Sequence, residues 1–282
     1  MIYKINNINK IMSIFINNSR PIIIIDQSYY IFNRYFASLS WFRRQTDEEL
    51  DYNNLTKNDE FILAFFRHFE NDINKLIKKF KTIKGNIILC NDCNRSEIWR
   101  NEIYKDYKEG RGKKSNFDSQ IFILFKNYIT NNLYNYCELD NLEADDIVYL
   151  LQEKIKEEIK DIKIIIITND NDYLQMYNEK VLIINMQFKD LSLRIKHHPK
   201  YELEYKIIFG DKSDNIPKIQ MGMKCDMALK IAMMDDEMRT KYLIENNLIN
   251  KYLFNKKLVD LREIPLYFVN KFNNKYNIII KK

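Results

Sequence analysis

The stretch IIIITNDND, residues 164–172, decides the fold of this chain. It begins with four consecutive isoleucines, and the run Lys163–Thr168 around them is typical of a strand buried on both faces of a sheet. Its second part places Asp170 and Asp172 directly after that strand. Because ligands of open parallel sheets bind beyond the carboxyl ends of the strands, the stretch predicts an acidic site at one sheet edge.

The same pattern recurs along the chain. Apolar runs bounded by turn residues predict further strands at Pro21–Ile25, Asn86–Cys90 and Val181–Asn185. Amphipathic stretches between the runs predict helices at Ser28–Phe42, Glu60–Phe80 and Leu142–Ile159. On the first helix we expect a core stripe of Tyr29, Phe32, Phe36 and Leu39. Strands alternating with helices predict an α/β fold: a doubly wound, mainly parallel sheet with helices on both faces.

Length and composition limit the class of protein. With 282 residues, of which 46% are hydrophobic, the chain can bury one sizeable core or one core with a small satellite domain. No apolar run approaches the length of a membrane span, and residues 1–20 lack the pattern of a secretory signal. The four cysteines are scattered, and the pair Cys90 and Cys93 has no second C-x-x-C to complete a zinc site. We therefore expect an intracellular protein of a reducing compartment, neither secreted nor bound to a membrane.

Three segments organise the chain. We expect an N-terminal extension over residues 1–20 and the α/β domain over 21–198, with a charged, aromatic-studded insertion at about 94–135. Such a long insertion in a compact domain indicates a functional or disordered segment. Residues 199–282 change to short helical pieces, with turns at GDKSDN and QMGMK, and predict a helical subdomain with a basic C-terminal tail.

Acidic residues gather where this fold places a site. Strands run into acids at three places, an E-A-D-D opens the helix near Leu142, and two further acids lie in the turn after Gly210. The predicted cluster is Asp26, Asp92, Glu143, Asp145, Asp146, Asp170, Asp172, Asp211 and Asp214. A lone Asp after a strand is most often a turn residue or a helix cap, and acids at a helix start favourably meet its dipole. The simultaneous recurrence of all these features weakens that interpretation.

The chemistry of the cluster favours metal ions. Crowded carboxylates are unfavourable unless cations neutralise them, and oxygen-only ligands favour Mg²⁺ or Mn²⁺. Two such ions suit phosphodiester hydrolysis. The net charge of +6, from 45 basic and 39 acidic residues, places a basic body around this acidic pocket. That distribution suits a polyanionic substrate, although basic residues can also serve solubility alone.

The order of these motifs resembles the structure-specific 5′-nuclease family: flap endonucleases, 5′-3′ exonucleases such as the 5′-nuclease domain of DNA polymerase I, and phage or viral relatives. The resemblance covers about residues 21–268, although Gln27 stands where the family usually has Gly. It is carried by Asp26, NDCNR at 91–95, WR at 99–100, YKEGR at 107–111, EADD at 143–146, TNDND at 168–172 and GDKSDNIP at 210–217.

The resemblance implies a PIN-like nuclease domain and a helix–three-turn–helix (H3TH) module that grips duplex DNA. It implies two Mg²⁺ ions, for which Mn²⁺ can substitute. Asp92, Glu143, Asp145 and Asp146 would serve mainly one ion. Asp170, Asp172 and Asp214 would serve the other, with Asp211 beside them and Asp26 between the two sets.

By the same resemblance the charged insertion is an arch or clamp for a single-stranded 5′ end. Lys108 and Arg111 would be catalytic and would face the scissile phosphate. The remaining DNA contacts would come from Arg95, Arg100, Lys105, Lys113, Lys114, Lys212, Ser213, Gly222 and Lys224. The module of the family usually has a G-hydrophobic-G hairpin that holds a monovalent cation, whereas this chain has Gly222-Met223-Lys224. This departure argues against K⁺ binding there, and Lys224 can contact phosphate directly.

The predicted function is therefore that of a Mg²⁺-dependent 5′-nuclease, a 5′-3′ exonuclease or flap endonuclease of replication or repair. Its partner would be branched or 5′-ended duplex DNA with a single-stranded 5′ arm, and RNA–DNA primers are a further candidate. We expect a monomer and find no sliding-clamp motif in the C-terminal sequence. Two alternatives stay open: a PIN-type ribonuclease, and a non-catalytic DNA-binding scaffold on a decayed nuclease fold.

Overall fold

A five-stranded parallel sheet forms the centre of the computed structural model, which describes residues 11–45, 50–110, 112 and 116–281. Its strand order is β4-β3-β2-β5-β6, and every pair is parallel. The strands are β2 (Ile22–Asp26), β3 (Ile87–Cys90), β4 (Asn135–Cys137), β5 (Ile164–Ile167) and β6 (Val181–Ile184). Four of them are the strands that the isoleucine-rich runs predict, and β4 is an addition.

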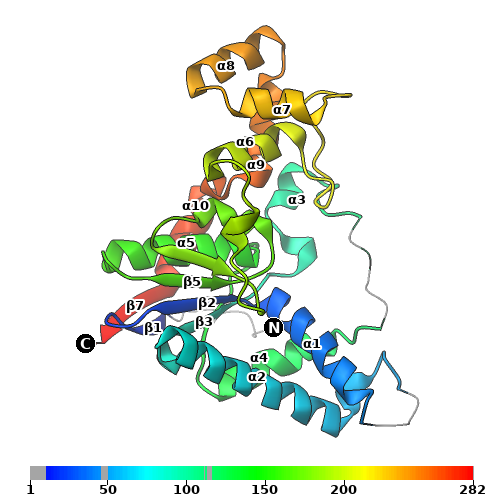
Figure 1. The fold of residues 1–282 in the computed structure, drawn as a ribbon, viewed down its shortest axis with the longest axis vertical. Coiled ribbons are helices and arrows are strands. Elements are labelled where there is room, and N and C mark those ends of the chain that lie inside the picture. Colours follow the sequence, from blue (N-terminus) through cyan, green and yellow to red (C-terminus); the bar gives the residue numbers. More distant parts are fainter. Residues whose placement is uncertain (1–10, 46–49, 111, 113–115, 282) are drawn as a thin grey trace, which may run out of the picture.

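Helices cover both faces of this sheet, which confirms the predicted fold class (Figure 1). One face packs against α1 (Gln27–Phe42), α2 (Asp59–Phe80) and α4 (Gln120–Asn131). The other face packs against α5 (Ala144–Glu158) and α10 (Leu266–Lys275). Alternate isoleucines of β5 enter the two cores, with Ile165 and Ile167 in one and Ile164 and Ile166 in the other. A strand buried on both faces therefore needs a continuous apolar run.

The expected stripe of α1 was wrong in part. The helix buries Tyr30, Ile31, Tyr35, Leu39 and Phe42, so only Leu39 belongs to both sets. Asp26 caps the helix, which begins at Gln27, and this start turns Tyr30 and Tyr35 toward the sheet. Phe36 is 38% exposed as a result.

Four helices form a separate subdomain at the top of Figure 1. They are α6 (Pro199–Phe209), α7 (Cys225–Ala232), α8 (Asp236–Glu245) and α9 (Ile249–Val259). Their core also receives Ile98 and Tyr107 from the charged insertion, near α3 (Arg100–Ile103). The insertion is thus tied to the helical subdomain by apolar packing.

The two ends of the chain meet in a second, two-stranded sheet. Strand β1 (Met12–Asn17) pairs in parallel with β7 (Tyr276–Lys281), and both add apolar residues to the core beneath α5. Residues 12–17, which we expected to belong to an N-terminal extension, therefore form a strand that packs on the sheet domain. Nor does the chain from Leu261 belong with the helical subdomain, because Leu261, Phe268 and Phe272 pack in the core of the sheet domain.

The predicted bounds of the insertion were also too wide, because α4 and β4 lie within residues 94–135 or at their end and belong to the sheet domain. Single 3-10 turns complete the fold at Leu55–Lys57, Lys84–Asn86, Arg95–Glu97, Asn171–Met176, Leu191–Arg194 and Leu261–Glu263. Among the described residues, no helix combines the length and apolar character needed to cross a bilayer.

Candidate functional site

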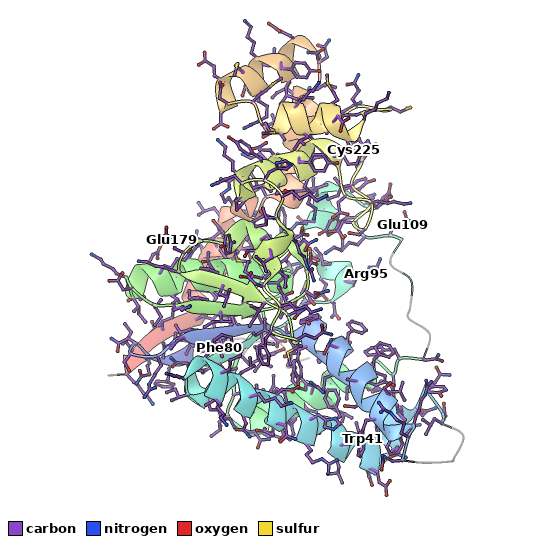
Figure 2. All side chains as sticks on the ribbon, viewed as in Figure 1. Trp41, Phe80, Arg95, Glu109, Glu179 and Cys225 are labelled. Carbon is purple, nitrogen blue, oxygen red and sulfur yellow. The ribbon has the colours of Figure 1, made fainter. Side chains whose placement is uncertain are left out.

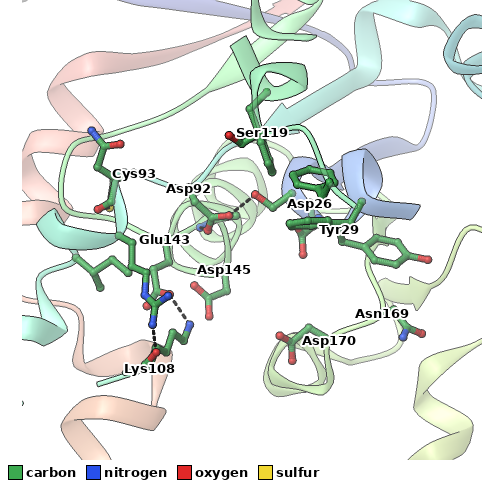
Figure 3. A pocket seen from close by; sticks show the side chains of 18 of the residues that line it. Asp26, Tyr29, Asp92, Cys93, Lys108, Ser119, Glu143, Asp145, Asn169 and Asp170 are labelled. Atoms are coloured by element: carbon green, nitrogen blue, oxygen red, sulfur yellow. Dashed lines mark hydrogen bonds and ion pairs between the residues drawn. The ribbon is translucent and has the colours of Figure 1, made fainter. Parts of the chain in front are cut away.

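An open cavity of about 1360 Å³ lies at the carboxyl ends of the central strands. Its lining includes predicted acids from three of the strand ends and from the start of α5: Asp26, Asp92, Glu143, Asp145 and Asp170. Figure 3 shows Asp26, Asp92, Asp145 and Asp170 around one open space, with Glu143 and Lys108 at its edge. The fold thus brings together acids that are far apart in the sequence.

Local structure places each of these carboxylates. Asp26 ends β2 and caps α1, where it accepts a hydrogen bond from the Tyr29 amide at 3.0 Å. The Thr168 hydroxyl donates to its other oxygen at 2.9 Å. Asp92 accepts hydrogen bonds from the Ala144 amide at 2.7 Å and from the Ser28 hydroxyl. Thr168 belongs to the TNDND motif, whereas sequence reasoning missed Ser28, because a hydroxyl near an acid carries no distinctive spacing.

Burial makes these acids hard to ionise without a cation. It raises the pKa of Asp26 to about 7, and the charge of Asp92 adds to the shift. The pKa values of Asp92 and Asp145 are also raised, in both cases chiefly by burial. Cys93 lines the same cavity, but burial raises its pKa to about 12, so its thiol remains protonated. The available ligands are therefore oxygens, which fit a hard divalent cation.

Lys108 lies at the edge of the cavity. Its side chain is buried, its ammonium forms an ion pair with Glu143, and it lies 3.7 Å from Asp214 Oδ2. Burial alone would raise the pKa of Glu143, but the charges of Lys108 and Arg100 bring it below its ordinary value. The backbone of Lys108 has a positive φ of 57°, and its amide donates to the Asp214 carbonyl at 3.0 Å. The hydroxyl of Tyr107, the first residue of the YKEGR motif, donates to Glu143 at 3.0 Å.

A second acidic group lies beside the cavity and contains Asp172, Asp211 and Asp214. The ammonium of Lys206, on α6, forms ion pairs with Asp172 and, at 2.7 Å, with Asp211. Burial raises the pKa of Asp211, but the Lys206 charge outweighs it and lowers the value to about 2. Sequence reasoning missed Lys206, because nothing in the pattern of α6 shows which lysine faces the acids.

The structure corrects the prediction for Arg100. This residue is 1% exposed, and its guanidinium donates to both oxygens of Asp146 at 2.8 Å, to Glu143 at 3.1 Å and to the Leu258 carbonyl at 2.9 Å. Its donors are used inside the protein, so Arg100 is not placed to bind DNA. Asp146 also accepts from the Trp99 indole at 3.0 Å. Asp146 also lies close enough to Glu143 and Asp145 to share an ion with them.

The remaining predicted DNA contacts lie on the surface. Arg95 lines the cavity and donates to the Lys108 carbonyl, and Lys105 is exposed nearby. Figure 2 shows Arg95 and Glu109 on the side of the molecule between the sheet domain and the helical subdomain. The other exposed members are Lys212, Ser213, Gly222 and Lys224. Arg111, Lys113 and Lys114 lie outside the described residues.

Comparisons with known proteins agree with this arrangement. Residues 21–204 match the family described as "5′-3′ exonuclease, N-terminal resolvase-like domain". The chain is 26% identical over 250 residues to ribonuclease H of Enterobacteria phage T4, covering 79% of this chain and 81% of that protein. It is 27% identical over 222 residues to a 5′-3′ exonuclease of Buchnera aphidicola subsp. Schizaphis graminum, covering 74% and 69%.

The fold is similar to that of the T5 5′-exonuclease solved with zinc ions. That similarity has a TM-score of 0.60 at 18% identity and covers 90% of this chain and 97% of the other.

Proposed function

Because this chain belongs to the 5′-3′ exonuclease family, we propose that it hydrolyses DNA phosphodiesters near 5′ ends or flaps with the help of two Mg²⁺ ions. The observation that carries the proposal is the group of carboxylates that share one cavity at the strand ends, of which Asp26, Asp92 and Asp145 have raised pKa values. The scaffold hypothesis has no explanation for such a group, since an acid-rich cavity lowers the stability of a protein that binds no cation.

The residues divide the work between them. Asp26, Asp92, Glu143, Asp145 and Asp170 would hold one or both ions at the cavity. Asp172, Asp211 and Asp214 would complete the second site, with Lys206 giving way to the metal or sharing the acids with it. Bound divalent ions supply a water nucleophile and neutralise charge on the attacking and leaving oxygens.

Lys108 would bind the scissile phosphate. Its ammonium already lies in the cavity, paired with Glu143, and a metal ion on Glu143 would release it toward a phosphate oxygen. Arg111 would act with it from the same insertion, as the family resemblance implies. Replacing Lys108 with Met should lower kcat more than it raises KM, because the contact strengthens as charge develops in the transition state.

The substrate would be branched or 5′-ended duplex DNA with a single-stranded 5′ arm, cut during replication or repair. The relative from phage T4 is named a ribonuclease H, which favours RNA–DNA primers as a second substrate class. We expect the chain to act as a monomer, because one chain supplies all the acids of the cavity.

An end-labelled panel of flap, nicked, gapped and RNA-primed duplexes tests this function, with product lengths read on a gel. Asp170→Asn and Asp145→Asn should each lower Mg²⁺-dependent cleavage by on the order of 10³-fold while changing duplex affinity little. The control is Asp161→Asn, at an exposed acid that pairs with Lys180, and this variant should cut normally. Unchanged cutting by both site variants would exclude the proposed centre, and cutting of RNA flaps alone would favour a ribonuclease.

A further inference from the structure

The hairpin, residues 218–224, joins the GDKSDNIP turn to α7 and has a lysine at each end. Its one positive φ is at Gly222, with a value of 74°. Lys224, which replaces the second glycine of the family pattern, has φ −85° and ψ 154°, a conformation that any residue adopts. The loss of that glycine therefore does not strain the backbone, and the reason expected from the sequence for excluding K⁺ does not hold.

The carbonyl groups of the hairpin bear more directly on K⁺ binding. A monovalent cation held by backbone needs several carbonyl oxygens to replace its water shell. Here the Gln220 carbonyl accepts from the Met223 amide at 3.2 Å, and the Lys224 carbonyl accepts from the Ala228 amide at 3.1 Å. The Met223 carbonyl accepts from the ammonium of Lys218 at 2.9 Å. A K⁺ ion at the Met223 carbonyl would meet the like charge of the Lys218 ammonium, which lies 2.9 Å from the same oxygen, so the residues present disfavour a K⁺ site.

The Lys218 ammonium is also fixed in position. It lies 3.8 Å from the ring centroid of Phe209, the last residue of α6. That ring stacks on Tyr205, with centroids 5.2 Å apart and planes inclined by 18°. An ammonium group has three N–H donors, and the Met223 carbonyl takes one of them. The remaining donors can bind an anion on the exposed side of the hairpin.

We propose that the Lys218 ammonium replaces the monovalent cation in this hairpin and binds a phosphate of the DNA duplex directly. The inference rests on the proposed function, since it assumes that the helical subdomain grips duplex DNA. Its consequence is that duplex binding by this protein does not require K⁺.

Fluorescence anisotropy of the full-length protein with a labelled nicked duplex, in EDTA to prevent cleavage, tests the proposal. Affinity is measured in KCl and in tetramethylammonium chloride at equal ionic strength, because the larger cation cannot enter a carbonyl site. We expect equal affinity within about twofold in the two salts. Lys218→Met should weaken binding about eightfold in both salts at 0.1 M, the factor for losing one phosphate contact by counterion release.

Lys241→Met provides the matched control, because it makes the same charge change on α8 at a side chain that is 75% exposed. It should change affinity less than twofold. A wild-type protein that loses more than fivefold in affinity without K⁺ would overturn the inference, as would a Lys218→Met variant that binds like the control. In both cases duplex binding itself persists, so the proposed function stands. A wild-type protein that binds no duplex in either salt would remove both.

Discussion

Replacing Arg100 with Met should destabilise the protein and leave the DNA affinity of the folded protein unchanged. Arg100 joins three parts of the structure: its own insertion, the start of α5 through Asp146 and Glu143, and the end of α9 through the Leu258 carbonyl. Because the arginine is 1% exposed and Asp146 is 0% exposed, the variant leaves a buried carboxylate without its cation.

The size of the effect follows from this geometry. Removing one partner of a buried ion pair typically costs about 3–5 kcal/mol. For a chain of this length each kcal/mol lowers Tm by roughly 2–4 °C, so we expect a fall of about 10 °C. The double variant Arg100→Met with Asp146→Leu should recover much of the loss, because replacing both charges with apolar groups removes the uncompensated carboxylate.

Thermal unfolding followed by circular dichroism measures the stability, and anisotropy with labelled duplex at 20 °C measures binding. Lys105→Met is the control, since Lys105 is an exposed lysine of the same insertion and its replacement should leave Tm unchanged. An Arg100→Met protein with unchanged Tm and tenfold weaker DNA binding would refute the structural role and restore Arg100 to the DNA interface.

Three further predictions concern the metal site, the GDKSDNIP turn and the chain end. The pKa of Asp26 is raised to about 7, so metal binding must displace its proton: Mg²⁺ affinity measured by calorimetry should rise with pH up to about 7 and then level off. Without metal the sign reverses for stability. Between pH 3.8 and about 7 the folded state holds a proton that the unfolded state has lost, so stability falls as the pH rises through this range, and at pH 8 the buried carboxylate is charged. Asp26→Asn should therefore raise Tm at pH 8. Gly210→Ala should lower the free energy of unfolding by about 3 kcal/mol, because φ is 75° and an added Cβ would lie 2.6 Å from the Pro217 carbonyl carbon. Gly85→Ala is the control: its added Cβ has no atom within 4 Å, so the same thermal assay should show no change. Tyr276→Ala should cost about 4 kcal/mol, because the side chain is fully buried and its ring packs against Phe272. Tyr267→Ala, at a residue that is 69% exposed, should leave Tm unchanged.

Sequence alone predicted the elements whose signal is local. The isoleucine runs predicted four of the five strands of the central sheet, because a strand buried on both faces requires unbroken apolar residues. Parallel strands end at a common edge, so the acids that follow them could be assigned to one site before any coordinates. Strand β4 was not predicted, because Asn135–Cys137 is three residues long and has no apolar run. Strands β1 and β7 were not predicted, because they pair residues that are far apart in the sequence.

Among the charged residues, only the tertiary structure decided the partners. A conspicuous motif placed Lys108 at the scissile phosphate, and the structure shows that its ammonium pairs with Glu143. Sequence also placed Arg100 on DNA, and it could not show Lys206 between Asp172 and Asp211 or Lys218 on the Met223 carbonyl. A charged side chain has the same identity whether it faces water or a buried partner. The direction in which it points depends on helices and turns from distant parts of the chain. The sequence therefore predicted the acids at the sheet edge, whereas only the tertiary structure identified the basic residues that pair with them.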